Sequence, residues 1–119
     1  LQRHISNAMV VGDKRKFLVA IISLDRDAVI EDAEALGISG RPSYEELAGD
    51  PKVYEAIDKE IHAVNTELAS FESIKGFFIA PNDFTVENGH ITPSLKLKKK
   101  VILKSYGQEV DALYKKLES

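Results

Sequence analysis

A lysine-rich stretch near the end of the chain is the place where this sequence is most suited to chemistry. Residues 91–106 read ITPSLKLKKKVILKSY, and a Thr-Pro-Ser turn is followed there by five lysines: Lys96, Lys98, Lys99, Lys100 and Lys104. A lysine ammonium is a compact charge on a flexible stem, so it can reach phosphate or carboxylate oxygens beyond its own backbone. The residues alone leave three interpretations open: a solvated helix face, a patch that binds anions, and a loop that delivers one catalytic lysine.

This basic character is local, because the chain as a whole is acidic. Its 119 residues carry 16 Lys and Arg against 19 Asp and Glu, for a formal net charge of −3. The acidic balance elsewhere, and the lack of aromatic residues interleaved with the lysines, argue against a nucleic-acid partner. A second basic group, Lys14, Arg15 and Lys16, lies between two apolar segments, where a solvated hairpin tip is the ordinary interpretation.

Other kinds of site find little support in the sequence. The chain has no cysteine, which excludes disulfides and thiolate metal sites and fits a reducing compartment such as the cytoplasm. His4, His62 and His90 lie in different predicted elements without a partner at ligand spacing, so we expect structural histidines and no metal site. There is no glycine-rich phosphate loop, and the longest apolar run, residues 17–24, is far shorter than a membrane-spanning helix of ~20 residues.

The first half of the chain predicts a hairpin followed by helices. Two short β-branched segments, residues 7–13 and 17–24, flank a polar turn and predict a β-hairpin over residues 7–24. One helical face then runs from an N-cap at Asp25 to a terminating Gly37. Ser43 and Glu46 have the spacing of a capping box.

Asp50 and Pro51 begin the helix with the clearest pattern in the chain, because proline suits the first helical position. Its apolar stripe predicts a helix through about Ser70: Val53, Ile57, Ile61, Val64 and Leu68.

The second half predicts another hairpin and a last helix. Residues 74–80 read as a buried strand, Phe84 and Val86 alternate with polar residues, and Asn88-Gly89 is a strong hairpin signal, which together predict a hairpin over residues 74–92. Apolar residues at helical spacing close the chain. The expected fold class is therefore α+β, one domain over residues 1–119 with a small, mostly antiparallel sheet covered by three or four helices.

Two motifs and the order in which they occur carry a family resemblance. They are VVGDKRKFL at residues 10–18 and the pattern ENG-x-[LI]-TP-[ST]-x-K-x-K that begins at Glu87. With the flanking segments, residues 5–25 and 76–106, and the final helix, they resemble the C-terminal domain of long-chain fatty acyl-CoA synthetases. These enzymes are members of the adenylate-forming ligase superfamily, and the resemblance covers nearly the whole chain.

The resemblance implies a two-step reaction in which a fatty acid and ATP form an acyl-adenylate, and coenzyme A then displaces AMP. In such enzymes a large N-terminal domain holds the acyl tunnel and most contacts to ATP and Mg²⁺. The C-terminal domain is a lid that rotates between the two half-reactions. The chain begins at Leu1 without a methionine, so we expect it to lack the N-terminal domain and the hinge, and to be inactive alone.

The resemblance also implies a catalytic lysine for the adenylation step. Many superfamily members have the pattern LPRTxxGK, which falls without gaps on residues 91–98 and puts its lysine at Lys98. Leu97 stands where the pattern has glycine, and Lys96 is the reserve candidate. Both lysines could face the same way, since two residues is one strand repeat.

The same resemblance suggests supporting roles for neighbouring residues. The expected positioning residues of the loop are Asn88, Gly89, Thr92, Pro93 and Ser94. From charge alone, contacts to coenzyme A phosphates are expected from Lys14, Arg15 and Lys16, whereas Lys99 and Lys100 are either solvated or attracted to the same phosphates. The alternative from another class is a non-enzymatic module whose lysine cluster, residues 96–104, binds anionic lipid headgroups, and peripheral membrane contact is compatible with either hypothesis.

Overall fold

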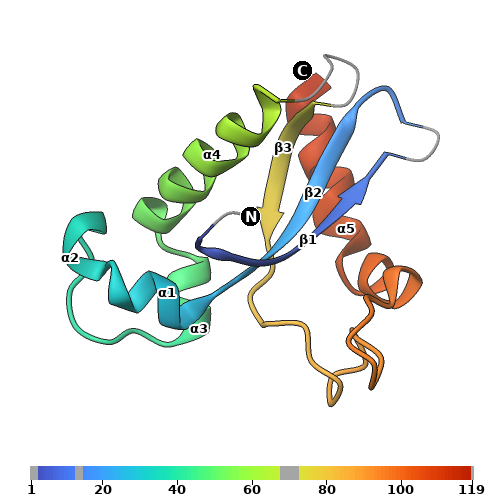
Figure 1. Cartoon of the computed structure of the whole chain (residues 1–119). Helices are drawn as coiled ribbons and strands as arrows, with labels where there is room; N and C mark the ends of the chain where they lie inside the picture. The colour runs from blue at the N-terminus through green and yellow to red at the C-terminus, as the bar shows by residue number, and fades with distance from the viewer. Residues whose placement is uncertain (1–2, 13–14, 68–72, 119) are drawn as a thin grey trace.

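A computed structural model of the chain describes residues 3–12, 15–67 and 73–118, and Figure 1 shows the path of the backbone. Within these residues a three-stranded sheet lies between helices. The elements in chain order are β1 (Ile5–Val11), β2 (Leu18–Leu24), α1 (Arg26–Glu31), α2 (Ala33–Leu36), α3 (Tyr44–Ala48), α4 (Pro51–Asn65), β3 (Ile74–Ile79) and α5 (Lys99–Glu118). The α+β class is confirmed.

The sheet is mixed, with the strand order β1-β2-β3. The first hairpin is confirmed, since β1 and β2 pair antiparallel with Ala8 opposite Ile22. Strand β3 pairs with the other edge of β2 in parallel, with Phe77 beside Ala20. A parallel pair requires a long crossover, and here α1 to α4 provide it. The expectation of a mostly antiparallel sheet is therefore wrong for one of its two strand pairs.

Helices cover both faces of this sheet, α4 on one side and α5 on the other (Figure 1). Alternate residues of β2 enter two separate apolar clusters: Ala20 and Ile22 face α4, whereas Val19 and Ile21 face α5. All four are fully buried. A strand buried on both faces explains why residues 17–24 read as one continuous apolar run.

The predicted second hairpin, over residues 74–92, is wrong. Ala80 still donates to the Ile22 carbonyl, but the chain then leaves the sheet, and Phe84 and Val86 belong to no strand. The apparent alternation has another cause, because Phe84 is a single anchor in the α5-side cluster while Val86 is exposed. The Asn88-Gly89 turn does form, but Ile91 returns to pair with Leu97.

Most of the helix boundaries follow the sequence signals. Asp25 accepts a hydrogen bond from the Ala28 N–H, and Ser43 and Glu46 form the reciprocal capping box. Asp50 caps α4, whose residues Val53, Ile57 and Ile61 are buried. Helix α4 ends at Asn65, and the rest of the expected stripe, Leu68 to Ser70, lies outside the described residues.

The helix expected from Asp25 to Gly37 is divided in two. Asp32 lies between α1 and α2 with φ −98° and ψ 13°, while Gly37 ends α2 in the left-handed conformation as predicted. The Asp32 carboxylate is hydrogen-bonded to Arg3 and His4. These contacts join the break to the start of β1, which no local pattern around Asp32 indicates.

Helix α5 is bent near its middle. Tyr106 has φ −119° and ψ 20°, outside the helical range, and it separates a first part that begins at Lys99 from a second part that ends at Glu118. The second part packs closely on β3 at Gly76, where an added Cβ would lie 2.7 Å from the Leu117 Cδ1 atom. The glycine thus permits a close approach of helix and strand.

Candidate functional site

The segment that joins the Asn88-Gly89 turn to α5 is a small hairpin, and we call residues 90–98 the lysine hairpin. Ile91 and Leu97 form an antiparallel bridge. The Thr92 N–H donates to the Lys96 carbonyl at 2.8 Å, and the Lys98 N–H donates to the His90 carbonyl at 2.8 Å. Ile91 and Leu97 pack on the α5-side cluster. The hairpin is thus attached to the core by its bridge and exposes its tip.

Thr92 and Ser94 stabilise the turn at that tip. The Thr92 hydroxyl accepts a hydrogen bond from the Lys96 N–H at 3.0 Å and lies 3.1 Å from the Ser94 hydroxyl. The Leu95 N–H donates to the Thr92 carbonyl, which closes a four-residue turn with Pro93 at its second position. Proline is preferred there because its ring fixes φ near the required value.

Leu95 has an unusual backbone conformation, with φ 66°. A left-handed residue that follows a turn is a common device for closing a short hairpin, and glycine usually occupies it because a Cβ is strained there. The Leu95 side chain is also 74% exposed. Burial therefore does not compensate the strain of this leucine.

The two candidate lysines extend from the hairpin into solvent. Lys96 and Lys98 flank the inward-facing Leu97, and both are exposed. Among the described residues, neither ammonium group has a hydrogen bond or an ion pair. Both lysines therefore have exposed side chains whose charges are available to an anion.

The Asn88-Gly89 turn fixes where the hairpin starts. The Asn88 side chain accepts hydrogen bonds from the Thr85 and His90 N–H groups and donates one to the Asp83 carbonyl at 2.8 Å. Gly89 has φ 80°, which is accessible to glycine without strain. This local network ties the turn to the segment that leaves β3.

Comparison with known proteins can now be added to this geometry. A sequence model of the AMP-binding enzyme C-terminal domain matches residues 1–118. The chain belongs to this family. Similar curated proteins are a long-chain-fatty-acid–CoA ligase of Mycobacterium tuberculosis, 35% identical over 94% of this chain and 19% of the relative, and long-chain-fatty-acid–CoA ligase 5 of Mus musculus, 34% identical over 98% of this chain and 17% of the relative.

This AMP-binding enzyme C-terminal domain therefore spans about a fifth of the length of the curated relatives that it matches. Its fold also resembles a solved structure, the A-PCP didomain of carboxylic acid reductase from Segniliparus rugosus in complex with AMP. The TM-score is 0.70 at 21% identity, and the match covers 96% of this chain and 14% of the other. The likeness supports the fold, and the comparisons do not favour the alternative of a non-enzymatic headgroup-binding module.

The lysines at the start of α5 extend the positive surface of this C-terminal domain. Lys99 and Lys100 are exposed in the first turn, which contains no acidic residue. Asp25, Ser43 and Asp50 cap α1, α3 and α4 with side-chain acceptors, whereas Lys98, the residue before α5, has none to offer. Positive charge therefore adds to the positive end of the helix dipole, an arrangement that favours nearby anions.

The basic tip of the first hairpin is arranged differently. Lys14 lies outside the described residues, and Lys16 is exposed. The Arg15 guanidinium is paired with Asp111 and lies over the Tyr114 ring, both on α5. The structure thus gives Arg15 a packing role and does not bring it to the lysine hairpin.

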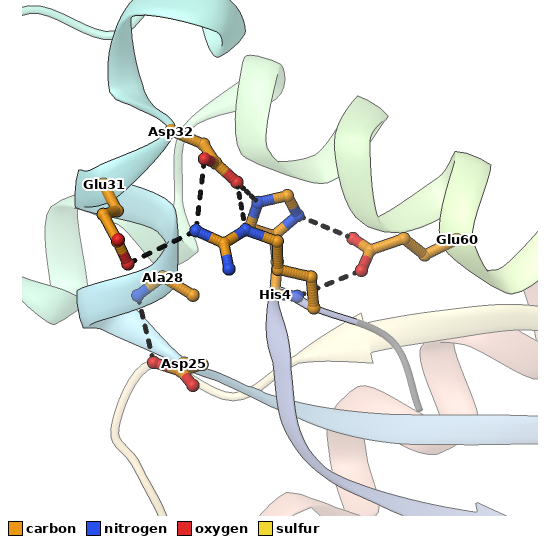
Figure 2. A network of polar contacts seen from close by, with 7 residues as sticks. His4, Asp25, Ala28, Glu31, Asp32 and Glu60 are labelled. Atoms are coloured by element: carbon orange, nitrogen blue, oxygen red, sulfur yellow. Dashed lines mark hydrogen bonds and ion pairs between the residues drawn. The ribbon is translucent and has the colours of Figure 1, made fainter.

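A separate polar network surrounds His4 (Figure 2). Its Nε2 atom lies 2.6 Å from an Asp32 oxygen, and its Nδ1 atom lies 3.1 Å from a Glu60 oxygen. Hydrogen bonds from Arg3 and then from His4 lower the pKa of Asp32 to about 2. The network joins the start of β1 to the α1–α2 break and to α4, so the expected structural role of His4 is supported.

No group of three or more His, Cys, Asp or Glu side chains that could hold a metal ion occurs within residues 3–12, 15–67 and 73–118. Over the same ranges, every helix is too short or too polar to cross a bilayer.

Sequence reasoning missed the part that His90 has in this region. His90 is buried, with 7% of its surface exposed, and its ring contacts Ser105 and Tyr106 of α5. The sequence does contain a weak signal that this segment packs on the core, because the apolar residues Ile91 and Leu97 lie on the two sides of the Thr92-Pro93-Ser94 turn. Nothing in it indicates which helix the histidine would meet.

Proposed function

We propose that this chain is the C-terminal lid of a long-chain fatty acid–CoA ligase and that the lysine hairpin supplies the cation for its adenylation step. The exposed, unpaired ammonium groups of Lys96 and Lys98 on a hairpin fixed to the core carry the proposal. The names of the curated relatives support the substrate class. ATP, coenzyme A and a large N-terminal domain are partners that the proposal requires.

The backbone of Leu95 bears on the choice between the two lysines. In the superfamily pattern LPRTxxGK, glycine directly precedes the lysine, and the left-handed conformation that suits glycine occurs at Leu95. A shift of two residues from the gapless placement puts that glycine at Leu95 and the lysine at Lys96. The backbone therefore favours Lys96, the reserve candidate from the sequence, over Lys98.

The chemistry of adenylation explains why a mobile cation is useful. A fatty acid carboxylate must approach the α-phosphate of ATP, and the two negative groups repel each other. An ammonium group that is brought in at this step stabilises the crowded oxygens of the transition state more than the separated reactants. A lid also excludes water, which strengthens this contact and protects the acyl-adenylate from hydrolysis.

Lys99, Lys100 and the first turn of α5 would add a weaker, longer-range attraction for phosphates. Toward coenzyme A, we assign this long-range electrostatic attraction, and no specific contact, to Lys99 and Lys100. The same role is assigned to Lys14 and Lys16 of the first hairpin. Arg15 is excluded from the set because Asp111 and Tyr114 already engage its guanidinium.

The test uses the full-length protein that contains this chain and measures the two half-reactions separately. Lys96→Ala should depress acyl-adenylate formation by about a hundredfold or more, as expected for loss of an electrostatic transition-state contact. Thioester formation from preformed acyl-adenylate should be largely unchanged. Lys98→Ala tests the second candidate lysine of the hairpin, and Lys104→Ala is the matched control. If neither Lys96→Ala nor Lys98→Ala slows adenylation selectively, the proposed role of the hairpin is wrong.

A further inference from the structure

We infer that His90 is a positioning residue for the proposed adenylation lysine, because its buried side chain fastens the lysine hairpin to the bend in α5. The inference rests on the proposed function for its catalytic consequence. Its structural content, a link from the hairpin through His90 to Ser105 and Tyr106, can be tested without any activity measurement.

The main chain of His90 connects two parts of the site. Its N–H donates to the Asn88 Oδ1 atom at 3.1 Å and to the Thr85 carbonyl at 3.2 Å. Its carbonyl accepts the Lys98 N–H at 2.8 Å. His90 is thus the residue at which the Asn88-Gly89 turn passes into the hairpin, and a change in its position would move both strands of the hairpin.

The ring of His90 connects the same residue to α5. Its Nε2 atom lies 3.0 Å from the Ser105 hydroxyl, which donates its own hydrogen to the Val101 carbonyl at 3.0 Å. The hydroxyl has one hydrogen, so the Nε2 atom must carry a hydrogen and donate it to the Ser105 oxygen. Of the two neutral forms of the ring, the hydrogen bond therefore selects the one that carries its hydrogen on Nε2.

Two aromatic rings also pack against the imidazole. Phe84 meets it edge-on at 5.4 Å between ring centres, and Tyr106 lies 5.7 Å away. Tyr106 also packs on Phe78 of β3, at 5.5 Å. Among the described residues, the buried His90 Nδ1 atom has no hydrogen-bond partner. An unpaired buried nitrogen is unfavourable, so simple packing would be served better by an apolar residue, and the Ser105 contact is what distinguishes histidine here.

This contact lies next to the bend in α5, where it can affect the orientation of the first part of the helix. Ser105 directly precedes Tyr106, the residue with non-helical backbone angles. The helical segment before the bend starts directly after Lys98, whose carbonyl accepts its first hydrogen bonds from Val101 and Ile102. His90 thus closes a loop of contacts that contains the hairpin, the first part of α5 and the bend, and it fixes the direction in which the lysines extend.

The variants separate the hydrogen bond from simple packing. His90→Leu keeps an apolar side chain but removes the donor, whereas His90→Gln keeps a donor that can reach Ser105. Ser105→Ala removes the acceptor at an exposed helical position where alanine is favourable. We expect His90→Leu and Ser105→Ala to behave alike and His90→Gln to retain most of the wild-type behaviour.

The first measurement is residue-resolved hydrogen exchange on the full-length protein. His90→Leu and Ser105→Ala should each speed exchange of the Lys98 amide by about tenfold. The Ala80 amide, bonded to the Ile22 carbonyl at 2.9 Å in the sheet, is the internal control and should not change. Unchanged protection of the Lys98 amide in both variants overturns the inference, whatever the activity.

The second measurement compares the half-reactions in the same variants. Misplaced reacting groups lower rates steeply, so adenylation should fall by about tenfold with thioester formation retained, and His90→Gln should restore it. Equal loss of both half-reactions would reduce His90 to a residue needed only for folding. The Lys96→Ala and Lys98→Ala results judge the proposed function separately, because the exchange data do not depend on catalysis.

Discussion

The Arg15 guanidinium lies over the ring of Tyr114, with its central carbon 4.4 Å from the ring centroid. The Tyr114 hydroxyl also lies 3.1 Å from the Val11 carbonyl oxygen and 2.7 Å from that of Phe17, at the two ends of the first hairpin turn. One buried aromatic residue of α5 is therefore hydrogen-bonded to both ends of the hairpin turn, and Arg15 lies over one face of its ring.

Replacing Arg15 should destabilise the domain, because the cation–π contact and the Asp111 pair are both lost. Each is worth at most about 1 kcal/mol at an exposed site, so we expect Arg15→Ala to lower the free energy of unfolding by about 1 kcal/mol. Urea denaturation measures the change. Lys16→Ala is the matched control, and an equal loss there would contradict a specific role for Arg15.

Leu95→Gly should stabilise the hairpin. The left-handed conformation costs a non-glycine residue roughly 1–2 kcal/mol, and glycine returns part of this gain through its larger entropy in the unfolded chain. We expect a net increase of about 0.5 kcal/mol in the free energy of unfolding, measured by denaturation. Leu97→Gly, which removes a half-buried contact, should instead destabilise the domain. A loss of stability in Leu95→Gly would mean that the leucine has a partner that compensates its strain.

The titration of His90 should make the stability of the domain depend on pH. Burial lowers the pKa of His90 below its ordinary value of 6.5. Protonation therefore favours the unfolded chain. The stabilising contribution of the neutral ring is complete above the unfolded pKa and is lost as the pH falls from there toward the folded pKa.

Denaturation of the wild type and of His90→Gln between pH 8 and pH 5 tests this dependence. The wild type should lose stability relative to the variant as the pH falls, because His4 and His62 are common to both proteins and their effects cancel. A difference that stays constant over this range, or one that changes in the opposite direction, would contradict the assigned burial of the ring.

Features that depend on neighbouring residues were predictable from the sequence. The Asp25, Ser43 and Asp50 caps and the buried stripe Val53-Ile57-Ile61 follow from rules that act within one or two helical turns. The position of β3 does not, because an apolar strand of the same composition can pair with either edge of the sheet in either direction. The local alternation at Phe84 and Val86 favoured a hairpin, and the pairing of β3 with β2 was decided by contacts distant in sequence.

The candidate site divides in the same way. The two lysines and the Thr92-Pro93-Ser94 turn were found from residue types and a family pattern. The strained backbone at Leu95 was not, since leucine gives no sign of a left-handed conformation. Nor was the contact between His90 and Ser105, because it depends on the bend of α5 at Tyr106.

The parallel pairing of β3 with β2 has a consequence for how the chain acquires its structure. Residue 18 is beside residue 74 in the finished sheet, so this pairing must close a loop that contains every helix from α1 to α4. Such distant contacts form slowly, since the entropy of closure is lost before the contact is gained. During synthesis on a ribosome, the first hairpin can form early, whereas β3 can pair only after the α1–α4 crossover has become compact. The α5-side cluster cannot be completed before α5 has been synthesised.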